Sequence, residues 1–238
     1  MEADRFCDAF SYGRYKVDRV LDDELATLKP GSRVLDVGCG TGVYLRRFAS
    51  KGFTPFGLEP APAMLAAARR DNPGVDIREG IATALPFEDA SVDAVTAIEV
   101  HRYLHLEDIR ASLREMVRVL RPGGFLFTTL VNTFSLDGFY LRQRSRQWQK
   151  GVEFDRRNPH CEFFTPSQAE AELVRAGATD ARTIGRMFAP MRLFYRWAPN
   201  LGKDVARTIE ASDDGLHRRV KVFKPFAGHL IAIGRRPA

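Results

Sequence analysis

A short apolar run followed by three glycines at alternating positions has the composition of a ligand-binding turn. The run is Val34–Val37, and the glycines are Gly38, Gly40 and Gly42. A helical pattern begins at Val43, so we expect a buried strand, a turn and a helix in that order. Glycines at such a turn permit positive φ and let a ligand approach the backbone N–H groups. In an open α/β sheet, ligands bind at the carboxyl ends of the strands.

An acidic residue at the end of the next predicted strand could bind the sugar of a nucleoside. This strand is Thr54–Glu59. The Glu59 carboxylate can accept hydrogen bonds from both hydroxyls of a ribose. The alternative is a carboxylate that caps the following helix. We consider it weaker because Pro60 and Pro62 already shape that turn.

The glycine spacing distinguishes this turn from that of the dinucleotide-binding proteins. Those read Gly-x-Gly-x-x-Gly, whereas this chain reads Gly-x-Gly-x-Gly with Asp36 two residues before the first glycine. The segment Asp36–Gly42 resembles motif I of the class I S-adenosylmethionine-dependent methyltransferases, in particular the small-molecule enzymes with a methyltransferase-11-like domain. The resemblance implies S-adenosylmethionine as cofactor, S-adenosylhomocysteine as product, and a doubly wound, seven-stranded, mostly parallel α/β sheet whose last strand is antiparallel.

A second segment that resembles the family follows the third predicted strand, 75–79. Leu85–Phe87 and Ser91–Asp93 match the family pattern, in which an Asp after a Gly holds the adenine amino group. Ile81 stands at the position of that Asp. The adenine amine is then expected to use a backbone carbonyl or the Thr83 hydroxyl, while apolar side chains contact the ring.

The resemblance implies a set of residues that bind the cofactor. Tyr15 is included because the amino-terminal region of the family often covers the cofactor. The full set is Tyr15, Asp36, Gly38, Cys39, Gly40, Gly42, Glu59, Pro60, Met64, Ile81, Ala82, Thr83, Ile98 and Glu99.

The segment after the fourth predicted strand, 94–100, offers the candidate catalytic residues. In the family it faces the methyl group, and here it contains His101 and Tyr103. An imidazole can accept a proton near neutrality, which makes His101 the local candidate for a general base. The alternative is a histidine that forms structural hydrogen bonds or contacts the cofactor. Methyl transfer needs mainly alignment and exclusion of water, so a dedicated base is optional.

The remaining elements are expected to place these residues in one domain, 1–238. Residues 1–32 form an amino-terminal helical cap, 33–131 the cofactor-binding core, and 132–165 with 186–219 the acceptor side. Arg121–Gly124 is predicted to be a turn before the fifth strand, 125–131. Thr165 is predicted to cap a helix that Gly177 ends. The last strand, within 228–236, is expected between strands five and six.

Composition narrows the class of protein and of partner. With 238 residues, 45% hydrophobic and 28% charged, the chain is an ordinary globular protein. Three scattered cysteines, a polar amino terminus and the lack of a long apolar run favour a cytoplasmic protein with reduced thiols. His160 and Cys161 are too few ligands for a metal site, so no metal is expected. The net charge of +6 arises in the second half of the chain, around 141–150 and 218–224.

The predicted function is methyl transfer to a small-molecule acceptor. The acceptor is expected to be an aromatic, lipophilic or anionic metabolite that is methylated on oxygen, nitrogen or carbon. Two alternatives stay open: an RNA methyltransferase that uses the basic second half, and a regulator that binds S-adenosylmethionine without catalysis. A nicotinamide dehydrogenase is disfavoured by the glycine spacing.

Overall fold

The computed structural model describes residues 9–135, 161–186 and 229–238, together with 145, 195, 198, 200, 201, 203–208 and 227. Two compact units are distinguished. One contains residues 26–129, 170–182 and 232–238, and the other contains the remainder of the chain. The glycine-rich turn and the residues around it belong to the first of these units, which we call the core unit.

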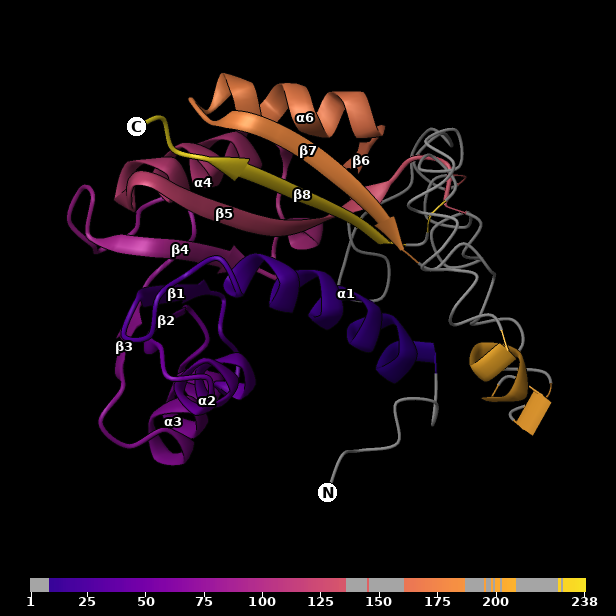
Figure 1. The fold of residues 1–238 in the computed structure, drawn as a ribbon, viewed down its shortest axis with the longest axis horizontal. Helices are drawn as coiled ribbons and strands as arrows, with labels where there is room; N and C mark the ends of the chain where they lie inside the picture. Colours follow the sequence, from indigo (N-terminus) through magenta and orange to yellow (C-terminus); the bar gives the residue numbers. More distant parts are fainter. Residues whose placement is uncertain are drawn as a thin grey trace. The chain divides into compact units, whose positions relative to one another are not determined.

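The described strands form one mostly parallel sheet in the order β3-β2-β1-β4-β5-β8-β7 (Figure 1). Strand β6 pairs with β5 outside this path. The pairs of β1 with β2, β1 with β4, β2 with β3 and β4 with β5 are all parallel. The strands are β1 Arg33–Val37, β2 Thr54–Glu59, β3 Asp76–Glu79, β4 Val92–Ala97, β5 Leu120–Asn132, β6 Phe163–Phe164, β7 Thr179–Arg186 and β8 His229–Arg235.

The last strand lies between β5 and β7, as the sequence predicts. Gly123 N donates to Arg236 O (3.0 Å) and Arg236 N donates to Gly124 O (2.9 Å). Such a reciprocal exchange is typical of antiparallel neighbours. The arrowheads of β7 and β8 point in opposite directions in Figure 1. The predicted doubly wound sheet with an antiparallel last strand is therefore confirmed.

Helices follow most of the parallel strands, and α4 lies on the face of the sheet opposite α2 and α3 (Figure 1). None of the helices that the structure describes is long and apolar enough to cross a membrane. The helices are α1 Ala9–Leu25, α2 Val43–Ser50, α3 Pro62–Asp71, the 3-10 helix η1 His101–Tyr103, α4 Leu106–Val119 and α6 Pro166–Arg175.

The ends of α6 agree with the sequence prediction. Gln168 N donates to Thr165 Oγ1 (3.3 Å), and Thr165 N donates to Gln168 Oε1 (2.9 Å). This reciprocal pair is a capping box, in which two N–H groups at the helix start are satisfied by side chains. Gly177 has a φ of 95° and follows the helix end, where a left-handed residue is favoured.

The end of one strand differs from the prediction for a physical reason, whereas helix α1, which ends at Leu25, lies within the predicted helical cap 1–32. Strand β4 ends at Ala97, not at residue 100, because Glu99 has a φ of 61° and cannot continue a strand. Residues 98–100 therefore leave the sheet and become available to line a site.

The predicted turn at Arg121–Gly124 is a bulge inside β5. Val92 pairs with Leu120 and Ala94 pairs with Phe125. The residues 121–124 of β5 therefore lie opposite the single residue 93 of β4. Gly123 has a φ of 77°, which allows the strand to bend without a steric penalty. The strand thus starts earlier than predicted, and the glycines shape its bend.

The core unit buries β1 and its neighbours. Val34 and Leu35 on β1 and Val95 on β4 have no exposed surface, as expected for a parallel sheet covered on both faces. A cluster formed by α2, α3, β3 and the glycine-rich turn fills one side of this sheet. Its members are Cys39, Leu45, Leu65, Ala68 and Ile77.

The glycine-rich turn allows a stability test. Gly42 has a φ of 77°, and a Cβ there would lie 2.3 Å from Asn72 Nδ2, which donates to Ala68 O. Gly31 has a similar φ of 80° with open space around it. We expect Gly31→Ala to lower the free energy of unfolding by about 1–2 kcal/mol through left-handed strain alone. Gly42→Ala should cost roughly 1–2 kcal/mol more because it also displaces Asn72. Urea unfolding of both variants measures the difference, and equal losses would contradict this packing.

Candidate cofactor-binding site

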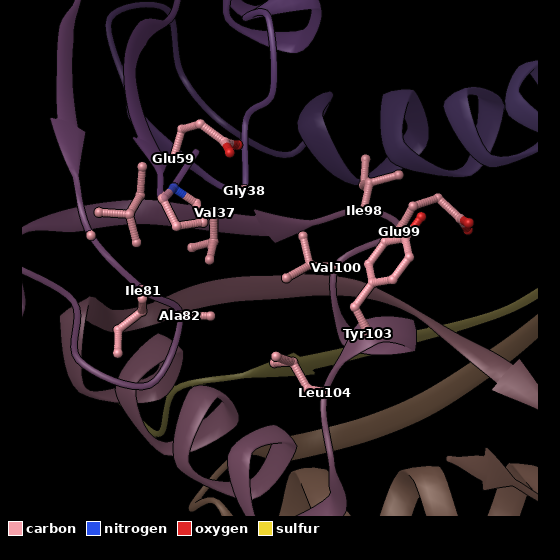
Figure 2. Close-up of a pocket in the computed structure, with 13 residues that line it drawn as sticks. Val37, Gly38, Glu59, Ile81, Ala82, Ile98, Glu99, Val100, Tyr103 and Leu104 are labelled. Carbon is pink, nitrogen blue, oxygen red and sulfur yellow. The ribbon is translucent and has the colours of Figure 1, made fainter. Parts of the chain in front are cut away.

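A cavity of about 300 Å³ opens where β1, β2, β3 and β4 end (Figure 2). All of its lining residues belong to the core unit. Most of the side chains are apolar, and the carboxylates and the phenol are the polar groups among them. The lining residues are Val37, Gly38, Leu58, Glu59, Pro60, Gly80, Ile81, Ala82, Ile98, Glu99, Val100, Tyr103 and Leu104.

The N–H groups of the glycine-rich turn point back into the protein. Gly38 N and Cys39 N both donate to Leu58 O, at 2.7 and 2.9 Å. Gly42 N donates to Cys39 O at 2.9 Å. The expectation that these amides are available to a ligand is therefore wrong for these three. The missing side chain of Gly38 instead allows the turn and Val100 to pack closely. A Cβ on Gly38 would lie only 2.6 Å from Val100 Cγ2.

Glu59 links the turn to the start of α3 and still faces the cavity. Its side chain is buried, Oε2 accepts from Gly40 N at 2.9 Å, and Oε1 accepts from Ala61 N at 3.0 Å. A carboxylate offers about four acceptor positions, so two remain for other donors. The capping interpretation of Glu59 and the ribose-binding one are thus compatible. Two hydroxyls on neighbouring carbons have the donors that this carboxylate could still accept.

Several predicted residues of the turn serve the fold and lie outside the cavity lining. Asp36 is buried and accepts a hydrogen bond from Thr96 Oγ1 at 2.7 Å. Cys39 belongs to the apolar cluster, and burial together with the charges of Asp36 and Glu59 raises the pKa of its thiol to about 12. A thiol that stays protonated is a poor nucleophile, in agreement with a purely structural role. Gly40, Gly42, Met64 and Thr83 also lie outside the lining.

Ile81 and Ala82 form one wall of the cavity (Figure 2). Ile81 is 56% exposed, so its apolar side chain is available for contact with a ligand in the cavity. Ala84 N donates to Ile81 O at 3.2 Å and closes a short turn behind this wall. The wall therefore offers apolar contact, as expected for the face of an aromatic ring.

The opposite wall is built by the residues that leave β4 early. Glu99 N donates to Thr129 Oγ1 at 2.7 Å, and the Glu99 carboxylate pairs with Arg102 at 2.6 Å. These contacts hold Glu99 in its positive-φ conformation beside the cavity, a conformation that often occurs at functional sites. Val100 and Leu104 complete this wall, and the sequence prediction missed both. Their apolar type next to His101 and Tyr103 was the available signal.

Tyr103 lies at the rim of the cavity, where its side chain is 67% exposed. The Arg102 guanidinium is 5.4 Å from the centre of its ring. An exposed ring and phenol at the rim can contact a second ligand without being part of the protein core.

His101 lies outside the lining and is buried. Nε2 is 2.9 Å from Ser112 Oγ, and Nδ1 is 2.8 Å from Thr128 Oγ1. The Thr128 hydroxyl donates to Ala97 O (2.9 Å), so Nδ1 must carry the ring proton and Nε2 must accept from Ser112. Burial lowers the pKa of His101 to about 4. This geometry argues against the predicted general base and favours the alternative of a structural hydrogen-bonding histidine.

Two further predictions lie outside this cavity. Tyr15 is on α1, outside the core unit, and its hydroxyl accepts from Arg19 at 3.3 Å. Its contact with the cofactor stays a prediction. His160 lies outside the described residues, and Cys161 is buried. Across the part of the chain that the structure describes, no three His, Cys, Asp or Glu residues come together as a metal site.

The burial of neutral His101 predicts a pH-dependent stability. Below pH about 6.5 the unfolded chain protonates this histidine, while the folded chain does not until pH about 4. The free energy of unfolding should therefore fall by about 2 kcal/mol from pH 7 to pH 5 because of this residue. The variant His101→Gln should not show this fall in the free energy of unfolding between pH 7 and pH 5. The variant His105→Gln, at an exposed position, should still show it. Urea unfolding across this range tests the assignment, and an unchanged slope in His101→Gln would contradict it.

Comparison with known proteins shows which family the chain resembles. A family model described as a methyltransferase domain matches residues 35–128. The chain is 39% identical over 119 residues to a demethylmenaquinone methyltransferase from Renibacterium salmoninarum, a match that covers 50% of this chain and 49% of that protein. The chain thus spans about half the length of this relative.

A longer match is to a demethylmenaquinone methyltransferase from Corynebacterium glutamicum. It is 38% identical over 173 residues, which cover 67% of this chain and 72% of the relative. A solved structure of a SAM-dependent methyltransferase from Thermotoga maritima has a similar fold, with a TM-score of 0.57, 20% identity and 94% of each chain covered. The chain therefore belongs to the class I S-adenosylmethionine-dependent methyltransferases.

Proposed function

We propose that this protein transfers a methyl group from S-adenosylmethionine to a small-molecule acceptor. One observation carries the proposal: the buried Glu59 carboxylate lies between the glycine-rich turn and the cavity, with one backbone N–H on each oxygen. Its remaining acceptor positions suit the two hydroxyls of a ribose. Membership of the family supplies the identity of the nucleoside.

We expect polar and apolar lining residues to bind different parts of the nucleoside. Glu59 would hold the ribose, and the walls at Ile81, Ala82, Val100 and Leu104 would enclose the base between apolar side chains. Because position 81 lacks a carboxylate, recognition of the base would depend on these apolar contacts more than on its exocyclic amine.

The chemistry requires alignment more than acid–base catalysis. When bound, S-adenosylmethionine supplies an electrophilic methyl group on a sulfonium. The lone pair of the acceptor forms the new bond to carbon as the carbon–sulfur bond breaks, and the acceptor releases its proton. The chain's own contribution is to fix the nucleoside against two walls and to exclude water from the reacting atoms. Both ring nitrogens of His101 are bound by Ser112 and Thr128, so this histidine does not receive the proton, and water is its final acceptor once the methyl group has moved and the product leaves.

For the acceptor we propose a lipophilic aromatic molecule of quinol type. Both named relatives are demethylmenaquinone methyltransferases. The exposed Tyr103 ring at the rim of the cavity offers an aromatic surface on the side of the predicted methyl group. Within the predicted acceptor segment 132–165, Phe163 on β6 is only partly buried, while Phe164 is buried. Most of the predicted acceptor segments lie outside the described residues.

Cofactor binding by Glu59 can be tested against a matched acid. Glu79 pairs in register with Glu59 at the end of the neighbouring strand, but it is exposed and does not line the cavity. We expect Glu59→Gln to weaken the affinity for S-adenosylhomocysteine at least about tenfold, since charge-assisted hydrogen bonds are lost. Glu79→Gln should leave the affinity unchanged, as measured by calorimetry.

A ligand variant separates the ribose contact from damage to the turn. Removing the 2′-hydroxyl from the ligand should weaken binding to the wild type but have little further effect on Glu59→Gln. If the deoxy ligand loses the same affinity with both proteins, Glu59 does not bind the sugar.

Methyl transfer itself is tested with cofactor labelled on the methyl group. A naphthoquinol should accept the label, whereas the corresponding oxidised quinone should not, because oxidation removes its nucleophilic electron density. The label should be recovered in the organic phase of an extract. Transfer into RNA or protein, or binding of the cofactor without transfer to any acceptor, would overturn the proposed acceptor or the proposed activity.

A further inference from the structure

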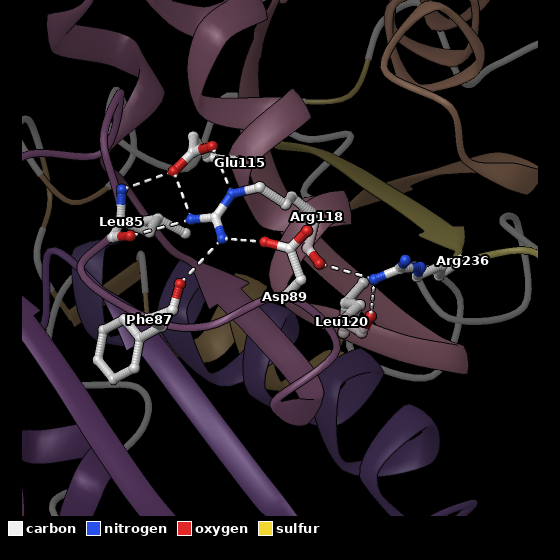
Figure 3. Close-up of polar contacts among 7 residues, drawn as sticks. All are labelled: Leu85, Phe87, Asp89, Glu115, Arg118, Leu120 and Arg236. Carbon is white, nitrogen blue, oxygen red and sulfur yellow. Dashed lines mark hydrogen bonds and ion pairs between the residues drawn. The ribbon is translucent and has the colours of Figure 1, made fainter.

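Arg118, near the end of α4, uses every hydrogen-bond donor of its guanidinium (Figure 3). Nε and one Nη2 donor bind the two oxygens of Glu115, at 2.7 and 2.8 Å. The other donors bind Leu85 O at 3.0 Å, Phe87 O at 2.9 Å and Asp89 Oδ1 at 2.6 Å. A guanidinium has five N–H donors in a fixed planar arrangement, and all five are engaged here.

These contacts fasten a loop that continues directly from a wall of the cavity. Gly80, Ile81 and Ala82 line the cavity, and the loop then passes through Leu85 and Phe87. Glu115 Oε2 also accepts from Leu85 N at 2.8 Å, so both backbone groups of Leu85 are bound by α4. Since Leu85 and Phe87 are buried as well, the loop has few ways to move independently of the helix.

The same helix continues from the opposite wall. Tyr103 and Leu104 line the cavity immediately before α4 begins at Leu106. The end of α4 is held in turn by Arg236, whose guanidinium donates to Arg118 O at 2.6 Å and to Leu120 O at 2.5 Å. One rigid helix therefore connects the two walls that face each other across the cavity.

We propose that Arg118 is a positioning residue that sets the distance between these walls and thereby the affinity for the base of the nucleoside. This inference rests on the proposed function. It differs from a purely structural role because only the part of the ligand that lies between the walls should respond to a change at Arg118.

The test compares Arg118→Lys with Arg110→Lys. Arg110 is on the same helix, pairs with Glu107 and Glu172, and is 26% exposed against 31% for Arg118. Arg118 donates to the loop behind the wall, whereas Arg110 donates to Glu107 and Glu172. Lysine has three donors and cannot reproduce the planar arrangement. We expect Arg118→Lys to weaken S-adenosylhomocysteine binding about tenfold, and Arg110→Lys to leave it unchanged.

A ligand without the base supplies the decisive readout. S-ribosylhomocysteine keeps the sugar and the amino-acid tail. The preference for S-adenosylhomocysteine is the ratio of the dissociation constants of the two ligands. This ratio should shrink by about tenfold in Arg118→Lys and stay at the wild-type value in Arg110→Lys. Equal losses for the two ligands, or no loss for either, would overturn the inference.

Two controls keep the result interpretable. If the wild type binds neither ligand, the proposed function fails and not the role of Arg118 alone. If Arg118→Lys does not fold, Glu115→Gln decides the question. This variant removes the charge that binds Arg118 but retains an oxygen for Leu85 N. It should therefore also reduce the preference for S-adenosylhomocysteine over S-ribosylhomocysteine. An unchanged preference in Glu115→Gln would then contradict the inference.

Discussion

The site depends on one buried carboxylate. Glu59 terminates β2, accepts from Gly40 N in the glycine-rich turn and from Ala61 N before α3, and faces the cavity. A buried carboxylate is stable only when hydrogen bonds compensate for lost hydration. The two backbone N–H groups provide this compensation before any ligand is present. Turn, strand end and helix start are therefore fixed relative to each other in the unliganded chain, and a ligand can bind with little rearrangement.

Much of the fold and part of the cavity could be predicted because local sequence determines them. The apolar run before Gly38, the capping box at Thr165 and the glycine after α6 each specify their element within a few residues. The resemblance to a family then supplied the mostly parallel sheet and the place of its last strand, and together with the strand-end position it indicated Glu59, Ile81 and Glu99. All three line the cavity. These residues lie at strand ends, where the topology alone decides which side chains meet.

What could not be predicted depends on contacts between distant segments. The burial of His101 results from Ser112 on α4 and Thr128 on β5, so its neighbours in sequence gave no sign of it. The N–H groups of the turn are bound by Leu58 O on β2, a pairing set by the parallel register. Arg118 and its loop are likewise far apart along the chain. In each case tertiary packing determines the hydrogen-bond partner, and the spacing of residues along the sequence does not reveal it.

The buried acid beside the turn also affects which nucleotides can compete for the site. Many nucleotide-binding folds bind phosphate through free amides at a glycine-rich turn. Here the amides of Gly38, Cys39 and Gly40 are already bound within the protein, and Glu59 places a negative charge beside them. A triphosphate would meet electrostatic repulsion where other folds provide attraction. The electrostatics of the turn thus disfavour a triphosphate relative to an uncharged group at this edge of the sheet.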